Sequence, residues 1–357
     1  DTHAPGRTRA GKAWSASLVV LAALSAAPQA DAQTTTIDRS PAVPDLVERL
    51  RQMNGQTSTH LETWLDGWDP FMAAIEQGDH PQGITMTSTG RFVVSYSRKN
   101  AAAGACSGTL LISDRFEPDN PGKDLDWTYY CETEAAGGLE WHPSTLQASG
   151  EVVIVGTHGG SRFYHVPETG PVEHLAHLDM SHGGRDASGL VYNQTDQRFY
   201  ALNGNGAITP ATVATQICRT DAGVSLFDPA TSFDDCKVIN AETSGQGSNL
   251  MMSDDGGMYL VSAFSTHGEP PQGKGEWGLY GARCETETIG LGLLGYGERV
   301  AFEDILSVSR IDWTGGRASE VFRKDISRTQ RAQSCVHKRP AFRFGGGVAA
   351  LENGDLI

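Results

Sequence analysis

Apolar and polar residues alternate in short runs along most of the chain, and turn-forming residues separate the runs. From Gly83 the chain reads Gly-Ile-Thr-Met-Thr-Ser-Thr-Gly-Arg-Phe-Val-Val, in which two apolar runs flank a turn at Gly90. Alternation with a period of two is typical of β-strands, and a glycine between two such runs is typical of a hairpin. The pattern therefore predicts an all-β fold built from hairpins.

The hairpin pattern recurs in copies that begin near residues 83, 138, 189, 248 and 347. Each middle copy is followed by a third apolar strand and a turn, for example Leu226-Phe227 before Asp228-Pro229-Ala230-Thr231. Four strands at intervals of roughly 50 to 60 residues are typical of β-propeller blades, because radial stacking buries the sheet faces and edges. We predict a β-propeller of four-stranded antiparallel blades over residues 79–357, with at least five blade starts.

The interval before residue 347 is longer than the others. We interpret the Gly-rich residues 265–304 as an insertion in blade four, which takes its third and fourth strands from either side of Asp312-Trp313-Thr314-Gly315. A sixth, hidden blade start is the alternative. The chain reaches Ile357 within the second strand of the fifth copy, so we expect the last blade to be truncated at the C-terminus.

Residues 1–32 have the pattern of a secretory signal peptide. Three basic residues precede an apolar run from Ala13 to Ala27, and Ala30-Asp31-Ala32 offers the small residues that a signal peptidase recognises. The run is shorter than the ~20 residues of a membrane-spanning helix. We expect a secreted or periplasmic protein with no membrane span after cleavage; a retained anchor is the alternative.

Residues 33–78 do not follow the repeat. Leu46, Leu50 and Met53 have helical spacing, and Trp64, Trp68 and Phe71 follow them. We predict a linker and a cap segment that packs against one end of the propeller. An aromatic binding site is the alternative interpretation of the same side chains.

The six cysteines are an even number in a chain that we expect to be exported to an oxidising compartment. Their order along the blades favours three disulfides, Cys106 with Cys131, Cys218 with Cys236, and Cys284 with Cys335. A zinc site is the alternative, although the chain has no Cys-x-x-Cys pair.

Charge and motifs exclude several classes of protein. The chain has 43 acidic residues against 28 lysines and arginines, a net charge of -15, and no basic patch, which argues against a nucleic-acid partner. It also has no Gly-x-Ser-x-Gly, no phosphate-binding loop and no His-Glu-x-x-His.

Blade topology brings the loop before each first strand and the loop after each second strand to one end. The candidate ligand-binding residues in these loops are His80, His158, Arg185, Asp186 and His267. The candidate ligands for a transition metal, which imidazole favours, are His80, His158, His182 and His267. The alternative hard-cation site uses the oxygen atoms of Asp186, Asn203, Asn249 and Glu140.

The repeat and its Asp-Pro-Ala-Thr and Asp-Trp-Thr-Gly turns resemble exported β-propellers of the broad lactonase, phytase-like and quinoprotein-like group. The resemblance is one of architecture, and such folds carry many functions. We expect a protein that binds a peptide, a glycan or a small molecule on one loop face. The alternative is a metal-dependent hydrolase of lactones or phosphoesters, or an oxidoreductase, in which His182 or Asp186 moves a proton beside a divalent metal.

Overall fold

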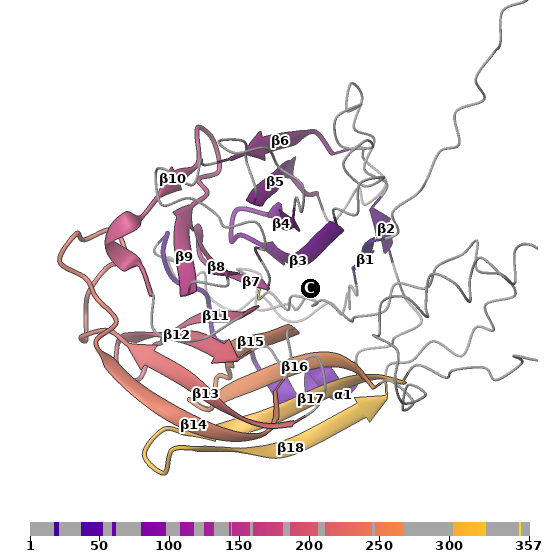
Figure 1. The fold of residues 1–357 in the computed structure, drawn as a ribbon, viewed down its shortest axis with the longest axis vertical. Coiled ribbons are helices and arrows are strands. Elements are labelled where there is room, and N and C mark those ends of the chain that lie inside the picture. Colours follow the sequence, from indigo (N-terminus) through magenta and orange to yellow (C-terminus); the bar gives the residue numbers. More distant parts are fainter. Residues whose placement is uncertain are drawn as a thin grey trace, which may run out of the picture.

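The structure is a computed structural model that is mostly β (Figure 1). It describes residues 18–20, 37–52, 59–61, 80–97, 108–117, 125–131, 143, 145–157, 160–180, 186–205, 211–244, 247–266, 303–325 and 350. Its helical elements there are α1 (Leu46–Gln52) and the short 3-10 helix η2 (Ala176–Leu178). None of the described helices is both long and apolar enough to cross a membrane.

Two antiparallel sheets of four strands come first along the chain. In one sheet the order is β3 (His80–Met86), β4 (Arg91–Ser97), β5 (Gly108–Arg115) and β6 (Trp127–Tyr130). In the other it is β7 (Leu146–Ser149), β8 (Val152–Thr157), β9 (Gly160–His165) and β10 (Glu173–His174). A two-stranded sheet of β1 (Leu18–Val20) and β2 (Thr59–Leu61) lies apart from them in Figure 1.

The remaining strands form one mixed sheet of eight. Its first half is β11 (Asp186–Asn193), β12 (Arg198–Asn205), β13 (Ala211–Arg219) and β14 (Asp235–Ser244). Its second half is β15 (Gly247–Met252), β16 (Met258–Thr266), β17 (Glu303–Asp312) and β18 (Arg317–Asp325). Each half is antiparallel, and the parallel pairing of β14 with β18 joins the halves.

This pairing shows that the predicted β-propeller is wrong. A propeller blade is a separate four-stranded sheet, whereas here Asn240 pairs with Arg317 and Ala241 with Ala318 across the two halves. At the other edge β11 and β15 contact each other, so the eight strands form a nearly closed, barrel-like sheet (Figure 1). Pairing the long outer strands β14 and β18 satisfies backbone groups that two isolated blades would leave unpaired.

Single hairpins of the prediction are present, and others are shifted. Gly83, Gly189 and Asn249 lie in β3, β11 and β15, each of which pairs with the next strand. In the second sheet the partner of β8 is Leu146–Ser149, and the predicted start near residue 138 lies outside the described residues. Leu226 and Phe227 lie in the loop between β13 and β14 and not in a third strand. The predicted insertion lies almost wholly outside the described residues.

Apolar cores fill the spaces between the layers. Ile154 and Phe163 pack against Leu190 and Ala201, between the second sheet and β11–β14. The interior of the eight-stranded sheet holds a second core, with Leu202 and Ile239 from one half and Leu250 and Leu260 from the other. A third core joins the first two sheets.

Candidate functional site

Two of the predicted site residues lie in strands that the structure describes. His80 is the first residue of β3 and pairs with Ser97, and Asp186 is the first residue of β11 and pairs with Asn205. Both therefore lie at the same end of their hairpins, away from the hairpin turns, in strands and not in the loops of propeller blades. The side chains of these two residues are not described.

Five other candidates lie outside the described residues: Glu140, His158, His182, Arg185 and His267. The ring of four histidines therefore stays a prediction. Within the part of the chain that the structure describes, no group of three or more His, Cys, Asp or Glu side chains is placed to hold a metal ion.

The asparagines of the predicted hard-cation site are buried in the sheets. Asn203 lies in β12, and Asn249 lies in β15. The side-chain nitrogen of Asn249 donates to the carbonyl oxygens of Leu146 and Ser188, each at 3.5 Å. Asn249 thus joins three strands, which is a structural role that the sequence pattern did not reveal.

Gln147 is the centre of this contact between edge strands. Its side-chain oxygen accepts hydrogen bonds from the backbone N–H of Leu190 at 3.0 Å and of Leu250 at 2.9 Å, and its side-chain nitrogen donates to the carbonyl of Leu250 at 2.5 Å. Strands β7, β11 and β15 are all sheet edges, whose backbone groups need partners. Gly189 permits the close approach, because a Cβ there would lie 2.8 Å from the backbone nitrogen of Leu250.

The chain between residues 37 and 52 covers the end of the sheets that carries the hairpin turns. The carbonyl of Ile37 accepts a hydrogen bond from the N–H of Glu151 at 2.6 Å, and the backbone N–H of Ser40 donates to Ser149 Oγ at 3.2 Å. Gly150 has a φ of 61°, and a Cβ there would collide with the carbonyl of Ile37. The β7–β8 turn is thus shaped to receive this segment.

Asp38 anchors the same segment to a third loop. Its carboxylate is buried and accepts hydrogen bonds from Ser225 Oγ at 2.7 Å and from the N–H of Leu226 at 2.9 Å. The guanidinium of Arg39 lies 4.3 Å from the centre of the Tyr192 ring, a cation–π contact. The segment therefore contacts the β7–β8 turn, β11 and the β13–β14 loop.

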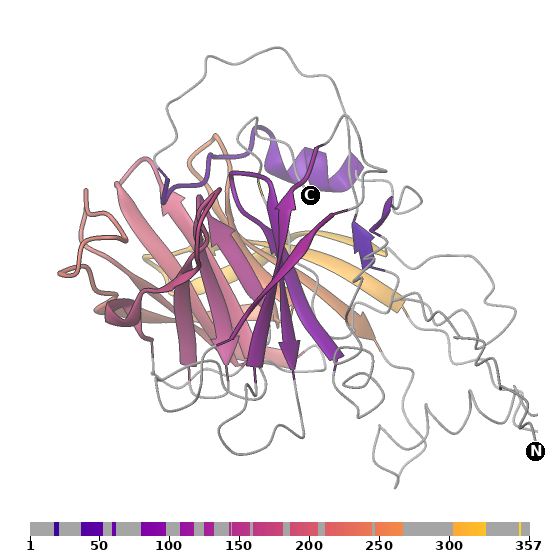
Figure 2. The same cartoon turned by 90° about the horizontal axis from the view of Figure 1, so that it is seen from above.

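The segment ends in α1, which packs on the second half of the large sheet. Leu46 and Leu50 are buried against Tyr259 and Val308, so the predicted helical spacing of these leucines is confirmed. The N–H of Val43 donates to the carbonyl of Met252 at 2.8 Å, beside the β15–β16 turn. Figure 2 shows α1 and the preceding segment along one side of the strand ends. The predicted aromatic part of the cap, Trp64, Trp68 and Phe71, lies outside the described residues.

The covered end also carries a buried acid and a histidine. His165 Nε2 lies 2.9 Å from Glu151 Oε2, and the His165 ring contacts Phe227 edge to face. The other Glu151 oxygen accepts the N–H of Glu168 at 3.3 Å. Because these groups bond to one another and the N–H of Glu151 bonds to the carbonyl of Ile37, they hold turns together at this end.

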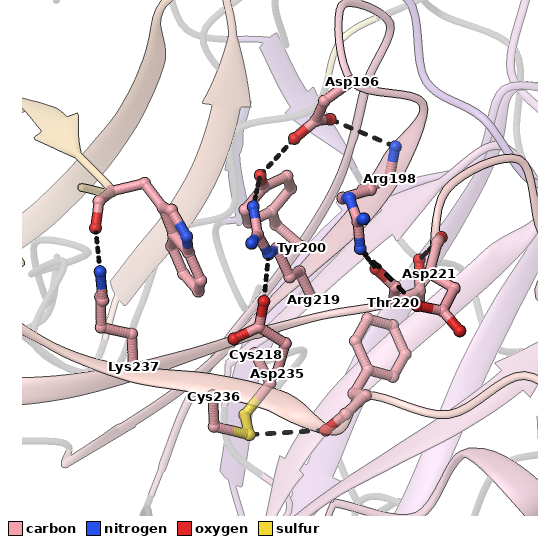
Figure 3. A network of polar contacts seen from close by, with 12 residues as sticks. Asp196, Arg198, Tyr200, Cys218, Arg219, Thr220, Asp221, Asp235, Cys236 and Lys237 are labelled. Atoms are coloured by element: carbon pink, nitrogen blue, oxygen red, sulfur yellow. Dashed lines mark hydrogen bonds and ion pairs between the residues drawn. A yellow bond between two sulfur atoms is a disulfide. The ribbon is translucent and has the colours of Figure 1, made fainter.

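A cluster of aromatic and charged side chains lies where the two halves of the large sheet meet (Figure 3). The Tyr200 hydroxyl donates to Asp196 at 2.5 Å, and Arg219 donates to Tyr200 at 3.3 Å and to Asp235 at 2.6 Å. Trp313 contacts Tyr200 edge to face, with ring centres 5.2 Å apart. No local pattern predicted this cluster, because its members come from the β11–β12 turn, from strands β12, β13 and β14, and from the turn after β17.

The cluster binds the turn between β17 and β18 to the first half of the sheet. Lys237 Nζ donates to the carbonyls of Trp313 at 2.9 Å and Thr314 at 3.2 Å, and the Arg219 guanidinium lies 4.9 Å from the Trp313 ring centre. Burial, followed by the hydrogen bond to Asp196, raises the pKa of Tyr200 to about 12. The phenol is therefore protonated at neutral pH and donates its hydrogen bond to Asp196, while the contacts of Arg219 and Lys237 hold the turn against β13 and β14.

One predicted disulfide is present within the described residues. Cys218 and Cys236 are directly opposite each other on β13 and β14, with 3.9 Å between their Cα atoms, and form a disulfide (Figure 3). Cys131 is also disulfide-bonded, to a cysteine outside the described residues. The pairings Cys106 with Cys131 and Cys284 with Cys335 therefore stay predictions.

Comparison with known proteins does not assign the chain to a family. The chain matches no protein-family model, and no curated protein or solved structure is significantly similar to it.

Proposed function

We propose that the chain is an exported protein that binds a ligand at the end of the sheets where β3 and β11 begin. The observation that carries the proposal is that residues 37–52 cover the opposite end, through contacts with the β7–β8 and β15–β16 turns. We call the end where β3 and β11 begin the uncovered end, because the described segment that packs across strand ends, residues 37–52, lies at the other end. Loops at one end of a rigid scaffold commonly carry binding residues.

The two described candidates support the choice of this end. His80 and Asp186 both begin strands there, although they come from different sheets. The Cys218–Cys236 disulfide is consistent with export, since disulfides persist in oxidising compartments. The ligand classes are those of the sequence analysis: a peptide, a glycan or a small molecule.

A screen with defined probes tests the proposal. Short peptides, neutral oligosaccharides and small organic acids are tested by thermal shift and then by calorimetry on the full chain. We expect a hit whose affinity falls at least tenfold in Asp186→Ala, with an unchanged melting temperature of the free protein, because a side chain that serves only the ligand contributes nothing to folding.

The matched control is Asp221→Ala, which removes an almost fully exposed carboxylate from the β13–β14 loop at the other end. This variant should bind every hit normally. A ligand that is lost in Asp221→Ala and kept in Asp186→Ala would place binding at the other end and overturn the proposal.

The metal-dependent hydrolase or oxidoreductase is the second candidate, with His182 and Asp186 as the proton-transferring groups. It rests on the four histidines of the sequence analysis. Elemental analysis of the full chain distinguishes it from a binding protein: a bound transition metal that is lost in His182→Ala supports the enzyme, and metal-free protein that still binds its ligand contradicts it.

A further inference from the structure

The side chains between the second sheet and β11–β14 change character along the strands. Near the covered end most of them are apolar, with Ile154 and Phe163 from one sheet facing Leu190 and Ala201 from the other, and the amide of Gln147 beside Ile154 is a polar exception. Alternate residues of a strand point to the same face, so the next residues on this face lie two positions along each strand. Towards the uncovered end, these residues are polar or small.

We call the polar side chains that lie two positions further along each strand, on this same face, the polar layer. Its residues from the second sheet and from β11–β13 are Thr145, Ser161, Ser188, Asn203 and Gln216. The first four are buried, and Ser188 Oγ donates to the carbonyl of Thr145 at 2.5 Å across the two sheets. The layer lies two residues along β11 from Asp186, where the strand begins.

Two hydroxyls of the polar layer have no hydrogen-bond partner among the described residues. Thr145 is 0% and Ser161 is 1% exposed, yet Thr145 Oγ1 and Ser161 Oγ make no hydrogen bond within the part of the chain that the structure describes. A buried hydroxyl without a partner costs free energy, and such groups in native proteins usually meet a water, an ion or a ligand. These hydroxyls are therefore unlike Thr220 at the far end of the same core, whose Oγ1 accepts from Phe199 and donates to Asp221.

The register places both hydroxyls around one position that has no side chain. Thr145 is opposite Gly156, since its carbonyl accepts the N–H of Gly156 at 2.9 Å, and Gly156 pairs with Ser161. Residues directly opposite each other on paired strands share a face. Thr145 and Ser161 thus lie on either side of Gly156 on one sheet face, with no side chain of β8 between them, and buried Met180 pairs with Ser161 on its other side.

We propose that the polar layer is the floor of a subsite for a neutral polyhydroxylated ligand, a carbohydrate, with Thr145 and Ser161 bonding its hydroxyl groups. This inference rests on the proposed function, because it assigns a ligand class to the same end of the sheets. The five side chains of the layer are hydroxyls and amides, which both donate and accept hydrogen bonds, as sugar hydroxyls do. None of them carries a charge to pair with an anionic or cationic group, whose burial without a partner is costly.

The test uses neutral trisaccharides of glucose, galactose, xylose and N-acetylglucosamine, titrated calorimetrically into the full chain. We expect one of them to bind and its affinity to fall about tenfold or more in Thr145→Val and in Ser161→Ala, because each change removes a hydrogen bond to the sugar. The free variants should melt at or above the temperature of the wild type, since each loses an unpartnered buried hydroxyl.

Thr220→Val is the matched control. It should lower the melting temperature, because it removes a fully bonded buried hydroxyl, and it should leave sugar affinity unchanged. This contrast separates loss of binding from loss of stability.

Two results would overturn the inference. One is a sugar whose affinity is the same in Thr145→Val and Ser161→Ala as in the wild type. The other is the absence of binding by any trisaccharide, together with a crystal structure in which a water alone bonds to both hydroxyls. In either case, a peptide or organic acid whose binding is lost in Asp186→Ala would leave the proposed function standing. Conversely, a sugar whose affinity falls in Thr145→Val and is unchanged in Asp186→Ala would support the subsite without testing the role of Asp186.

Discussion

The side-chain oxygen of Gln147 lies 2.9 Å from the backbone nitrogen of Leu250 and accepts its hydrogen bond, although the two residues belong to different sheets. The same amide oxygen accepts a hydrogen bond from the N–H of Leu190, and the amide nitrogen donates to the carbonyl of Leu250. One buried side chain therefore provides partners for backbone groups of both edge strands, β11 and β15. We expect Gln147→Leu to lower the free energy of unfolding by about 2–4 kcal/mol, because it leaves several buried backbone groups unpaired.

Urea denaturation measures this loss. Gln52→Ala is the control, since Gln52 is exposed and bonds only to Glu48 among the described contacts. It should change the free energy of unfolding by less than about 0.5 kcal/mol. Equal stabilities of Gln147→Leu and Gln52→Ala would mean that the edge strands do not depend on Gln147.

Local patterns predicted the hairpins at Gly83 and Gly189 because alternation and turn glycines are encoded within a few residues. The pairing of Asn240 with Arg317 was not predictable in this way, since it joins strands that are distant in sequence and needs only two residues from each. That pairing decides between separate blades and one eight-stranded sheet. A local repeat therefore predicts strands well and their assembly poorly.

The same limit applies to one strand and to two buried polar residues. Strand β13 was not predicted, because Ala211–Arg219 mixes small, polar and apolar residues. The third strand was placed instead at Leu226 and Phe227, which are more apolar but lie in a loop. Gln147 gave no signal, because a polar residue within a strand normally indicates a solvent-facing position, and Asn249 was interpreted as a cation ligand and not as a contact between strands. Their function depends on strand edges that only the folded chain brings together.

Asp38 should contribute strongly to the attachment of the N-terminal segment. Its buried carboxylate accepts hydrogen bonds from Ser225 and Leu226, and both donors lose their partner in Asp38→Ala. We expect a loss of about 2–3 kcal/mol in the free energy of unfolding. Limited proteolysis should then cleave between residues 37 and 52 faster than in the wild type. Asp228→Ala, an exposed turn residue, is the control, and equal cleavage rates would contradict the role of Asp38.

The Cys218–Cys236 disulfide closes a loop with a sequence separation of 18. In the chain-entropy model a loop of this size is worth about 3 kcal/mol. The double variant Cys218→Ala with Cys236→Ala should therefore unfold at lower denaturant concentration than the wild type, and reducing agent should change its stability less. Peptide mapping without reduction should find the Cys218–Cys236 link in the wild type; a different partner for either cysteine would refute this pairing.

Tyr200 should make the protein sensitive to alkali. Its pKa rises from 10.0 to about 12 in the folded chain, so the folded state binds the phenolic proton more tightly than the unfolded state. The stabilisation is complete below pH 10 and is lost as the pH rises through about 12. Burial also raises the pKa of Tyr259. A phenolate absorbance titration should therefore lose one late-ionising tyrosine in Tyr200→Phe and lose none in Tyr129→Phe. A titration identical in wild type and Tyr200→Phe would disprove the assignment.

Trp313 should hold the junction between the two halves of the large sheet. The backbone pairing there involves only two residues of β14 and two of β18, and Lys237 adds hydrogen bonds to the carbonyls of Trp313 and Thr314. Trp313→Ala removes the ring that contacts Tyr200, Arg219 and Lys237. Since the ring is half-buried, we expect a loss of about 2 kcal/mol, below the range for a fully buried tryptophan.

Hydrogen exchange locates the effect of Trp313→Ala. The amides of Ala241 and Ala318 should exchange faster in the variant, because the junction opens without unfolding of the whole sheet. Trp313→Phe should restore part of the protection by keeping an aromatic ring beside Arg219. Val321→Ala, an exposed change on the same strand β18, should leave these amides unaffected. Unchanged exchange at Ala318 in Trp313→Ala would show that the two pairs of backbone residues hold the junction without the cluster.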